Sequence, residues 1–305
     1  MSSKYDLIII GGGIAGMTAA IYAARANLQT LLLEKMVCGG LVNSTHVVEN
    51  FPSYPSINGM DLMEKVREHV DSLGVAVTEV IEIQSVDLSG PTKTVTTDEG
   101  TFAAPAVILT TGRMPRKLPI ECDFEQIHYC AICDGSAYKD KNVIVVGGGN
   151  SGVDESLYLL GLGVRSILVV EEFDRLLASE KACKQLLSHS NVEVMTSTRI
   201  EAINGTDRLE SVVLRNKNSD DLIKKTTDGM FIYIGQDPQT SLFSDLLEMD
   251  ASGYIAVDNE MKTSLAGVFA AGDVIRKKYR QITTAMGDAT IAALAAVEYL
   301  SASRQ

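Results

Sequence analysis

The chain carries the same strand, glycine loop, helix and strand unit twice, and this repeat constrains the fold more than any other feature. The first unit starts in the apolar residues 6–10 and returns in residues 30–34. The second starts in residues 143–146 and returns in residues 167–171. Continuous apolar strands that alternate with helices are typical of parallel sheets covered on both faces. The sequence therefore predicts an α/β fold with two Rossmann-like dinucleotide-binding domains.

We predict that the second unit is inserted into the first domain, because signals for the first nucleotide return after about residue 240. The first domain is then discontinuous and comprises residues 1–113 and 240–305. The second domain comprises residues 114–239. A chain of 305 residues, of which 46% are hydrophobic, is long enough to give both domains a sizeable core.

Two stretches outside the repeat have patterns of their own. Residues 77–111 alternate apolar and polar side chains between turn signals, which predicts a β-meander. The final stretch is rich in alanine from Thr283 to Leu300, which predicts a helix close to the C-terminus.

The net charge narrows the range of partners. Lys and Arg total 27 against 39 Asp and Glu, so the chain carries −12 at pH 7. This excess of negative charge disfavours nucleic acid and anionic membranes. No uninterrupted stretch of about 20 apolar residues is present, and the N-terminus lacks the order of segments found in signal peptides. We therefore expect a cytoplasmic protein that binds neither nucleic acid nor membrane.

The first glycine loop reads Gly11-Gly12-Gly13-Ile14-Ala15-Gly16 and follows the first strand directly. In a G-x-G-x-x-G loop the glycines allow a tight turn, a close approach of the backbone to a pyrophosphate, and contact between helix and strand. The pyrophosphate then lies on the N-terminus of the helix. Glu34 ends the next strand, where its carboxylate can accept the ribose hydroxyls. A dinucleotide site is predicted here.

The second loop, Gly147-Gly148-Gly149-Asn150-Ser151-Gly152, repeats the pattern, and the acid position is Glu171 with Glu172 beside it. An adenosine 2′-phosphate requires Arg or Lys. Two carboxylates at this position would repel it, by about 1–4 kcal/mol per close pair. The loop therefore suits NADH better than NADPH. The alternative interpretation is an exposed acidic turn in a vestigial site.

Cys130-Ala131-Ile132-Cys133 is a C-x-x-C pair beside a strand–helix–strand unit, which predicts a redox-active dithiol. A metal site is not predicted, because zinc would need two more ligands and only His128 is near. Asp134 can serve the proton transfers of thiol–disulfide exchange, or it can simply cap a turn. Cys38 is expected near the first nucleotide. The remaining thiols and imidazoles with no such signal are Cys122, Cys183, His46, His69 and His189.

In chain order, these motifs resemble the low-molecular-weight thioredoxin reductases. The likeness extends from Tyr5 to about Leu300. Besides the glycine loops and the cysteine pair, it rests on Gly39-Gly40-Leu41, Val48-Glu49-Asn50-Phe51-Pro52, Thr110-Thr111-Gly112, Ile234-Gly235, Val268-Phe269-Ala270-Ala271-Gly272-Asp273 and Tyr279-Arg280-Gln281.

The resemblance implies that the first unit holds FAD and that the second holds the nicotinamide nucleotide. It also implies a homodimer and a thioredoxin-like partner protein. The residues expected at FAD are Gly11, Gly13, Ile14, Ala15, Gly16, Glu34, Gly40, Asn50, Thr111, Gly112, Gly272, Asp273, Arg280, Gln281 and Ile282. Those expected at NAD are Gly147, Gly149, Asn150, Ser151, Gly152, Glu171 and Glu172.

One departure from the family concerns the nicotinamide nucleotide. Where members of the family carry His-Arg-Arg, and a further Arg four positions on, this chain has Glu171-Glu172-Phe173 and Leu177. Family members that use NADPH usually carry Ala at the position of Gly152. We therefore expect NADH as the electron donor and do not expect NADPH.

The expected function is that of a thioredoxin reductase that uses NADH and FAD. The resemblance implies that Cys133 faces the flavin, that Cys130 attacks the partner disulfide, and that Asp134 manages the proton. Two alternatives keep the dithiol chemistry: a reductase supplied by ferredoxin, and a dithiol oxidase that passes electrons to oxygen. A further alternative is a redox sensor that binds FAD without turnover.

Overall fold

The computed structural model describes residues 5–45, 47–120 and 124–303, so His46 and Cys122 lie outside the described residues. The chain divides into two compact units. The first comprises Met1–Met114 and Asp237–Gln305, and the second comprises Pro115–Gln236. These boundaries lie within three residues of those expected from the sequence.

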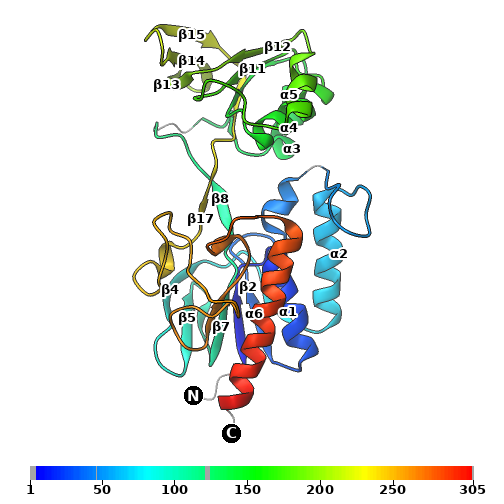
Figure 1. Cartoon of the computed structure of the whole chain (residues 1–305), viewed down its shortest axis with the longest axis vertical. Coiled ribbons are helices and arrows are strands. Elements are labelled where there is room, and N and C mark those ends of the chain that lie inside the picture. Colours follow the sequence, from blue (N-terminus) through cyan, green and yellow to red (C-terminus); the bar gives the residue numbers. More distant parts are fainter. Residues whose placement is uncertain (1–4, 46, 121–123, 304–305) are drawn as a thin grey trace. The chain divides into compact units, whose positions relative to one another are not determined.

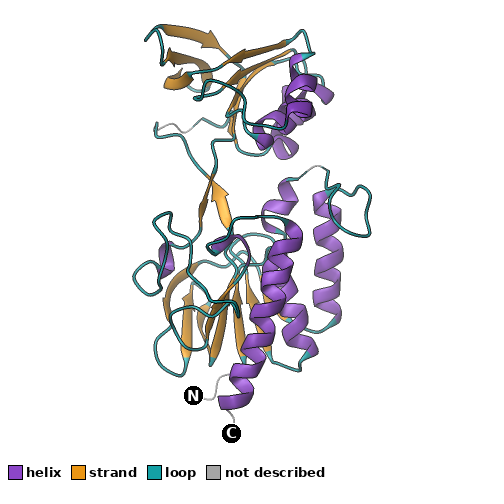
Figure 2. Ribbon diagram, in the orientation of Figure 1, coloured by secondary structure: helices purple, strands orange, loops and turns teal. Residues whose placement is uncertain are grey.

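The first unit is built on a parallel sheet in the order β18-β7-β1-β2-β3. All four residues of β1 are buried, since the sheet is covered on both faces. Figures 1 and 2 show the long helices of this unit against one face and the smaller antiparallel sheet toward the other. The strands are β1 (Leu7–Ile10), β2 (Thr30–Leu33), β3 (Ala76–Thr78), β7 (Ala106–Leu109) and β18 (Val268–Ala270); the helices are α1 (Ile14–Arg25), α2 (Gly59–Ser72) and α6 (Ile282–Ser303).

The predicted β-meander is wrong at both of its ends. Only β4 (Ile83–Asp87), β5 (Lys93–Thr97) and β6 (Gly100–Ala104) form an antiparallel sheet. The flanking strands β3 and β7 join the parallel sheet instead. The reason is visible in β7, whose four residues are all buried, as in a central parallel strand rather than a half-exposed one. The helix predicted near the C-terminus is confirmed as α6.

Two apolar clusters lie on opposite faces of the first sheet. One joins Leu7, Ile9 and Leu32 to alanines of α1 and α6. The other joins Ile8, Ile10 and residues of the antiparallel sheet. The alternation of β1 side chains between the two clusters follows from the period of two along a strand. The alanines let α1 and α6 lie close together over the sheet.

The second unit repeats this plan with the parallel order β12-β11-β10-β16-β9 and a three-stranded antiparallel sheet. Its fold, like that of the first unit, is Rossmann-like. The parallel strands are β9 (Ile127–His128), β10 (Asn142–Val146), β11 (Ser166–Val170), β12 (Val192–Met195) and β16 (Gly229–Ile232); the antiparallel strands are β13 (Thr198–Gly205), β14 (Leu209–Asn216) and β15 (Leu222–Thr226); the helices are α3 (Ala131–Asp134), α4 (Asn150–Gly161) and α5 (Glu180–Leu187).

Two short strands, β8 (Arg113–Pro115) and β17 (Gln236–Pro238), form the crossings between the units. They are hydrogen-bonded to each other as a two-stranded sheet. The Arg116 amide donates to the Gly235 carbonyl at 2.9 Å, and the Gln239 amide donates to the Gly112 carbonyl at 3.0 Å. No helix in the described part of the chain combines the length and the apolar character that a bilayer crossing requires.

Candidate dithiol and dinucleotide sites

The first glycine loop is shaped by contacts that leave no room for side chains. Gly11 has φ +106°, and a Cβ there would lie 2.4 Å from the Thr110 carbonyl oxygen. A Cβ on Gly16 would lie 1.8 Å from the Gly11 carbonyl oxygen, so helix α1 starts directly against the strand. Gly13 caps α1 without a side-chain hydrogen bond, and a Cβ on it would meet only the Gly40 Cα at 4.0 Å. The backbone here is open to an approaching pyrophosphate.

Glu34 lies at the end of β2, as predicted, and both carboxylate oxygens already accept backbone hydrogen bonds. Oε2 accepts from the Gly12 amide at 2.5 Å, and Oε1 accepts from the Met36 amide at 2.8 Å. Cys38 lies behind the loop, since a Cβ on Gly12 would lie 2.5 Å from its sulfur. Burial raises the pKa of the Cys38 thiol to about 12, which keeps the thiol protonated and unreactive.

Gly272 lies against the start of α1, because a Cβ on it would approach the Ala15 Cβ to 2.8 Å. Asp273, next in the chain, pairs with Arg113 at 2.8 Å and with Lys277 at 3.3 Å. Gly112 has φ +64°, with open space where a side chain would be. The structure therefore gathers predicted FAD residues from both ends of the chain around one loop.

The other predicted FAD residues are less tightly grouped. The Asn50 side-chain amide donates to Gln281 Oε1 at 3.0 Å, so residues 231 positions apart meet. Arg280 places its guanidinium 4.1 Å from the centre of the Tyr254 ring, and its buried Nε has no hydrogen-bond partner. The Thr111 hydroxyl donates to the Gln239 carbonyl at 2.6 Å. Ile282 is the first residue of α6.

Cys130 and Cys133 form a disulfide. Cys130 caps α3 and is half-buried, whereas Cys133 is exposed. The Cys133 amide donates to the Cys130 sulfur at 3.1 Å. The Ala131 amide donates to the Tyr233 hydroxyl at 3.0 Å, which ties the cysteine pair to the segment after β16. The dithiol therefore lies on a fixed turn of the second unit.

A chain of three polar side chains stands beside the disulfide. Asp134 Oδ2 lies 3.2 Å from His128 Nδ1, and His128 Nε2 lies 2.7 Å from the Tyr138 hydroxyl. The His128 ring also contacts Phe231, 5.1 Å between ring centres. Burial lowers the pKa of His128, and the Asp134 carboxylate opposes that shift. Burial also raises the pKa of Tyr138 to about 12.

Sequence reasoning missed His128, which it considered only as a possible zinc ligand. No local pattern pointed to a contact with Asp134. The contact exists because β9 ends at His128, two residues before Cys130, and Asp134 ends the helical turn that follows. Within the described residues, no group of three metal-binding side chains is present.

The second glycine loop has the same geometry as the first. Gly147 has φ +106°, and a Cβ on it would lie 2.3 Å from the Tyr233 carbonyl oxygen. A Cβ on Gly152 would lie 1.9 Å from the Gly147 carbonyl oxygen, whereas a Cβ on Gly149 would meet nothing within 4 Å. Gly152 is thus a packing position and Gly149 an open one. Ser151 is exposed in the first turn of α4.

Glu171 repeats the contacts of Glu34 with its own glycine loop, and Glu172 has a separate partner. Glu171 is 5% exposed; its Oε2 accepts from the Gly148 amide at 2.5 Å and its Oε1 from the Phe173 amide at 2.8 Å. Glu172 is exposed, and its Oε1 lies 2.9 Å from Lys217 Nζ. The local sequence does not predict these partners, because they are backbone amides of the loop and a lysine 45 positions away.

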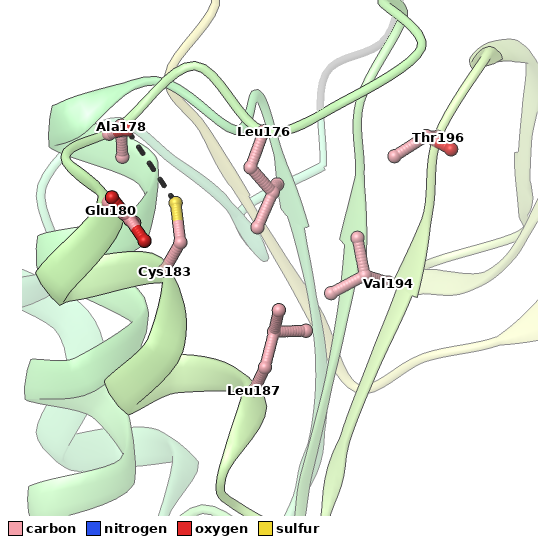
Figure 3. Close-up of a pocket in the computed structure, with 7 residues that line it drawn as sticks. All are labelled: Leu176, Ala178, Glu180, Cys183, Leu187, Val194 and Thr196. Atoms are coloured by element: carbon pink, nitrogen blue, oxygen red, sulfur yellow. Dashed lines mark hydrogen bonds between the residues drawn. The ribbon is translucent and has the colours of Figure 1, made fainter.

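Asn150 supports the segment that follows Glu171. Its Oδ1 accepts from the Ser179 amide at 3.1 Å. Farther along, a pocket of about 430 Å³ lies between α5 and β12 (Figure 3). Leu176, Leu187 and Val194 make its lining largely apolar, and the Cys183 sulfur donates to the Ala178 carbonyl at 3.7 Å. None of the residues predicted to bind a nucleotide lines this pocket.

Comparisons with known proteins match nearly the full chain to one family. The sequence pattern of the pyridine nucleotide-disulphide oxidoreductases matches residues 5–289. Thioredoxin reductase of Treponema pallidum is 37% identical over 305 residues, covering 98% of each chain. The chain belongs to the low-molecular-weight thioredoxin reductase family. Membership makes it a flavin-dependent disulfide reductase, and the disulfide at Cys130 and Cys133 lies in the C-x-x-C motif on which the resemblance rests.

Other relatives of this thioredoxin reductase family member support the same conclusion. The crystal structure of Lactococcus lactis thioredoxin reductase matches with a TM-score of 0.91 at 36% identity, covering 98% of this chain and all of that one. The enzyme of T. acidophilum matches with a TM-score of 0.89 at 31% identity, covering 99% of each. A Clostridium pasteurianum protein described as a 34.2 kDa protein in rubredoxin operon is 42% identical, covering 97% of each.

Proposed function

We propose that the chain reduces the disulfide of a thioredoxin-like protein, with electrons that pass from NADH through FAD to Cys130 and Cys133. The observation that carries this proposal is the disulfide between these two cysteines, in a unit that also carries its own glycine loop. The relatives from Treponema pallidum and Lactococcus lactis are named thioredoxin reductases, which supports the choice of partner. The resemblance also leads us to propose a homodimer.

FAD fits the first glycine loop on structural grounds. Gly13 and Gly112 offer open backbone where a side chain would stand, and helix α1 starts with a glycine cap that leaves its first amides for a ligand. Gly40 lies against Gly13, and Gly272 lies against Ala15, so two other segments of the chain also contact this loop. When bound, FAD would supply two-electron chemistry between a hydride donor and a disulfide.

The exchange with the partner protein uses the two cysteines in sequence. The Cys130 thiolate attacks one sulfur of the partner disulfide, which breaks that bond and releases one partner thiolate. Cys133 then attacks the Cys130 sulfur, which releases the second partner thiolate and restores the Cys130–Cys133 disulfide. Two electrons pass to the partner, and the two protons lost by the cysteines balance those gained by the partner thiolates. Thiol–disulfide exchange generally follows this course through a mixed disulfide.

Asp134 is proposed to hold the proton during this exchange. It lies directly after Cys133, and His128 fixes its carboxylate at 3.2 Å. Because burial disfavours the charged imidazolium, His128 favours the neutral state and can hold the carboxylate through its Nδ1–H without contributing a full charge. Asp134 therefore stays available for the proton that moves to or from a cysteine.

The donor is tested by anaerobic flavin bleaching with NADH, NADPH and reduced ferredoxin in parallel. We expect NADH to bleach the flavin at the lowest concentration and to support thioredoxin reduction. Cys130→Ser and Cys133→Ser should each abolish that reduction while FAD stays bound. Bleaching by reduced ferredoxin alone would show that ferredoxin and not NADH is the electron donor. Wild-type turnover in either serine variant would contradict the role of the dithiol.

A further inference from the structure

Three segments of the second unit are joined by backbone hydrogen bonds beside the predicted ribose position. The Thr198 amide donates to the Glu171 carbonyl at 2.9 Å, and the Ser197 amide donates to the Phe173 carbonyl at 2.7 Å. The Lys217 amide donates in turn to the Ser197 carbonyl at 2.7 Å. The turn between β14 and β15 is therefore fixed against the loop that follows β11.

This arrangement brings a cation to the acidic loop. Lys217 Nζ lies 2.9 Å from Glu172 Oε1, and the two side chains are 45% and 57% exposed. Arg175, in the loop itself, is 76% exposed and lies 3.9 Å from Asp174 Oδ1. Arg215 pairs with Glu201 and Asp220 at 3.0 and 2.6 Å. Lys217 is thus the basic side chain that pairs with Glu172, and it comes from a different sheet.

The position of this ion pair relates to the nucleotide. In a dinucleotide-binding unit the acid that ends the second strand meets the ribose hydroxyls, and a basic group close by accommodates a 2′-phosphate. Glu171 has that position, as its bond to the Gly148 amide matches the bond of Glu34 to the Gly12 amide. Glu172 is the next residue in the chain, and Lys217 reaches it from the turn between β14 and β15.

We propose that the Glu172–Lys217 ion pair determines nucleotide selectivity, because Glu172 occupies the lysine that would otherwise bind a 2′-phosphate. The inference rests on the proposed function, in that the second unit must bind an adenine dinucleotide. Glu171 accepts two backbone hydrogen bonds and keeps its negative charge, so Glu172 adds to selectivity by occupying Lys217. Lys217 itself is a latent phosphate ligand.

The test uses FAD-loaded protein and needs no turnover. Calorimetry gives the dissociation constants of adenosine 2′,5′-bisphosphate and of AMP for the wild type, Glu172→Gln, Lys217→Met and the double variant. We expect Glu172→Gln to tighten the bisphosphate by about tenfold relative to AMP, since one ammonium–phosphate contact becomes available. Lys217→Met alone should not tighten it, and the double variant should lose the gain.

The outcomes separate the two ideas. If AMP binds but Glu172→Gln leaves the ratio unchanged, or if the gain survives in the double variant, the inference about Lys217 is overturned while the nucleotide site stands. If neither nucleotide binds to the wild type or to any variant, the proposed nucleotide site is itself wrong, and the inference fails with it. Circular dichroism of each variant verifies that the exposed substitutions leave the fold intact.

Discussion

Asp134 and His128 show how one local contact changes the chemistry expected of a sequence motif. The C-x-x-C pair alone predicts a dithiol, and the aspartate after it is equally compatible with a cap. The 3.2 Å contact to the half-buried His128 gives the carboxylate a fixed direction. Since Tyr138 holds the far nitrogen of His128 at 2.7 Å, the ring orientation is determined from both sides.

We predict that Asp134→Asn lowers kcat for thioredoxin reduction about 100-fold or more, because positioned proton transfer contributes on that scale. His128→Gln should lower kcat less, about 2- to 10-fold, and should change the acidic limb of the pH profile. Both variants should retain FAD. Steady-state kinetics between pH 5.5 and 9 supplies the measurement, and an Asp134→Asn variant with wild-type kcat would show that the aspartate is only a cap.

Glu155 lies on α4 with a buried oxygen, Oε2, that has no hydrogen-bond partner. Burial, with Asp154 beside it, raises the pKa of Glu155 to about 7. The native state therefore retains a proton that the unfolded chain releases at lower pH. The stability that this proton provides is fully present below the unfolded pKa, and it is lost as pH rises toward the folded pKa.

We predict that Glu155→Gln raises the free energy of unfolding by about 2 kcal/mol at pH 8 and changes it little at pH 5. Urea denaturation of both proteins at the two pH values gives the comparison. Glu180→Gln on α5 serves as a control, because its carboxylate is 83% exposed and should have an effect below about 0.5 kcal/mol at either pH. A gain for Glu155→Gln that is equal at both pH values would argue against a titrating carboxylate.

At the scale of elements, the two glycine loops were predictable because most of their glycines lie where a side chain would clash with nearby backbone. The strand, loop and helix order follows from short-range pattern alone. The contacts of Glu34 and Glu171 with backbone amides were not predictable in the same way, since a carboxylate at a strand end can face a ligand or the loop. No sequence pattern predicted the ion pair of Lys217 with Glu172, because the two residues are 45 positions apart and Lys217 lies in a turn of another sheet.

The open and the packed glycines of the second loop give a matched pair of substitutions. Gly152→Val adds a branched side chain where a Cβ alone would lie 1.9 Å from a carbonyl oxygen, and it should destabilise the second unit by about 1–3 kcal/mol. The Cβ of Gly149→Val meets no atom within 4 Å, so this variant should change stability less while it weakens binding of the pyridine nucleotide. Thermal unfolding and nucleotide titration distinguish the two effects. Equal loss of stability in both variants would contradict the packing assignment.

At the scale of the whole molecule, the inserted domain was predictable because the second βαβ repeat interrupts signals for one nucleotide. The boundaries differed by a few residues, since β8 and β17 pair with each other and the crossing point depends on that long-range pairing. The same limit applies to the meander, where burial on both faces decided that β7 belongs to the parallel sheet.

The paired crossing strands have a consequence for how such a molecule could arise. Because Arg116 bonds to Gly235 and Gln239 bonds to Gly112, the two ends of the inserted unit leave the host as neighbours. Residues 115–236 therefore leave and re-enter the first unit as the loop of a β-hairpin does. Inserting or removing the whole second unit therefore requires no new strand order in the first unit. A different domain could be inserted between β8 and β17 while the first glycine loop stays unchanged.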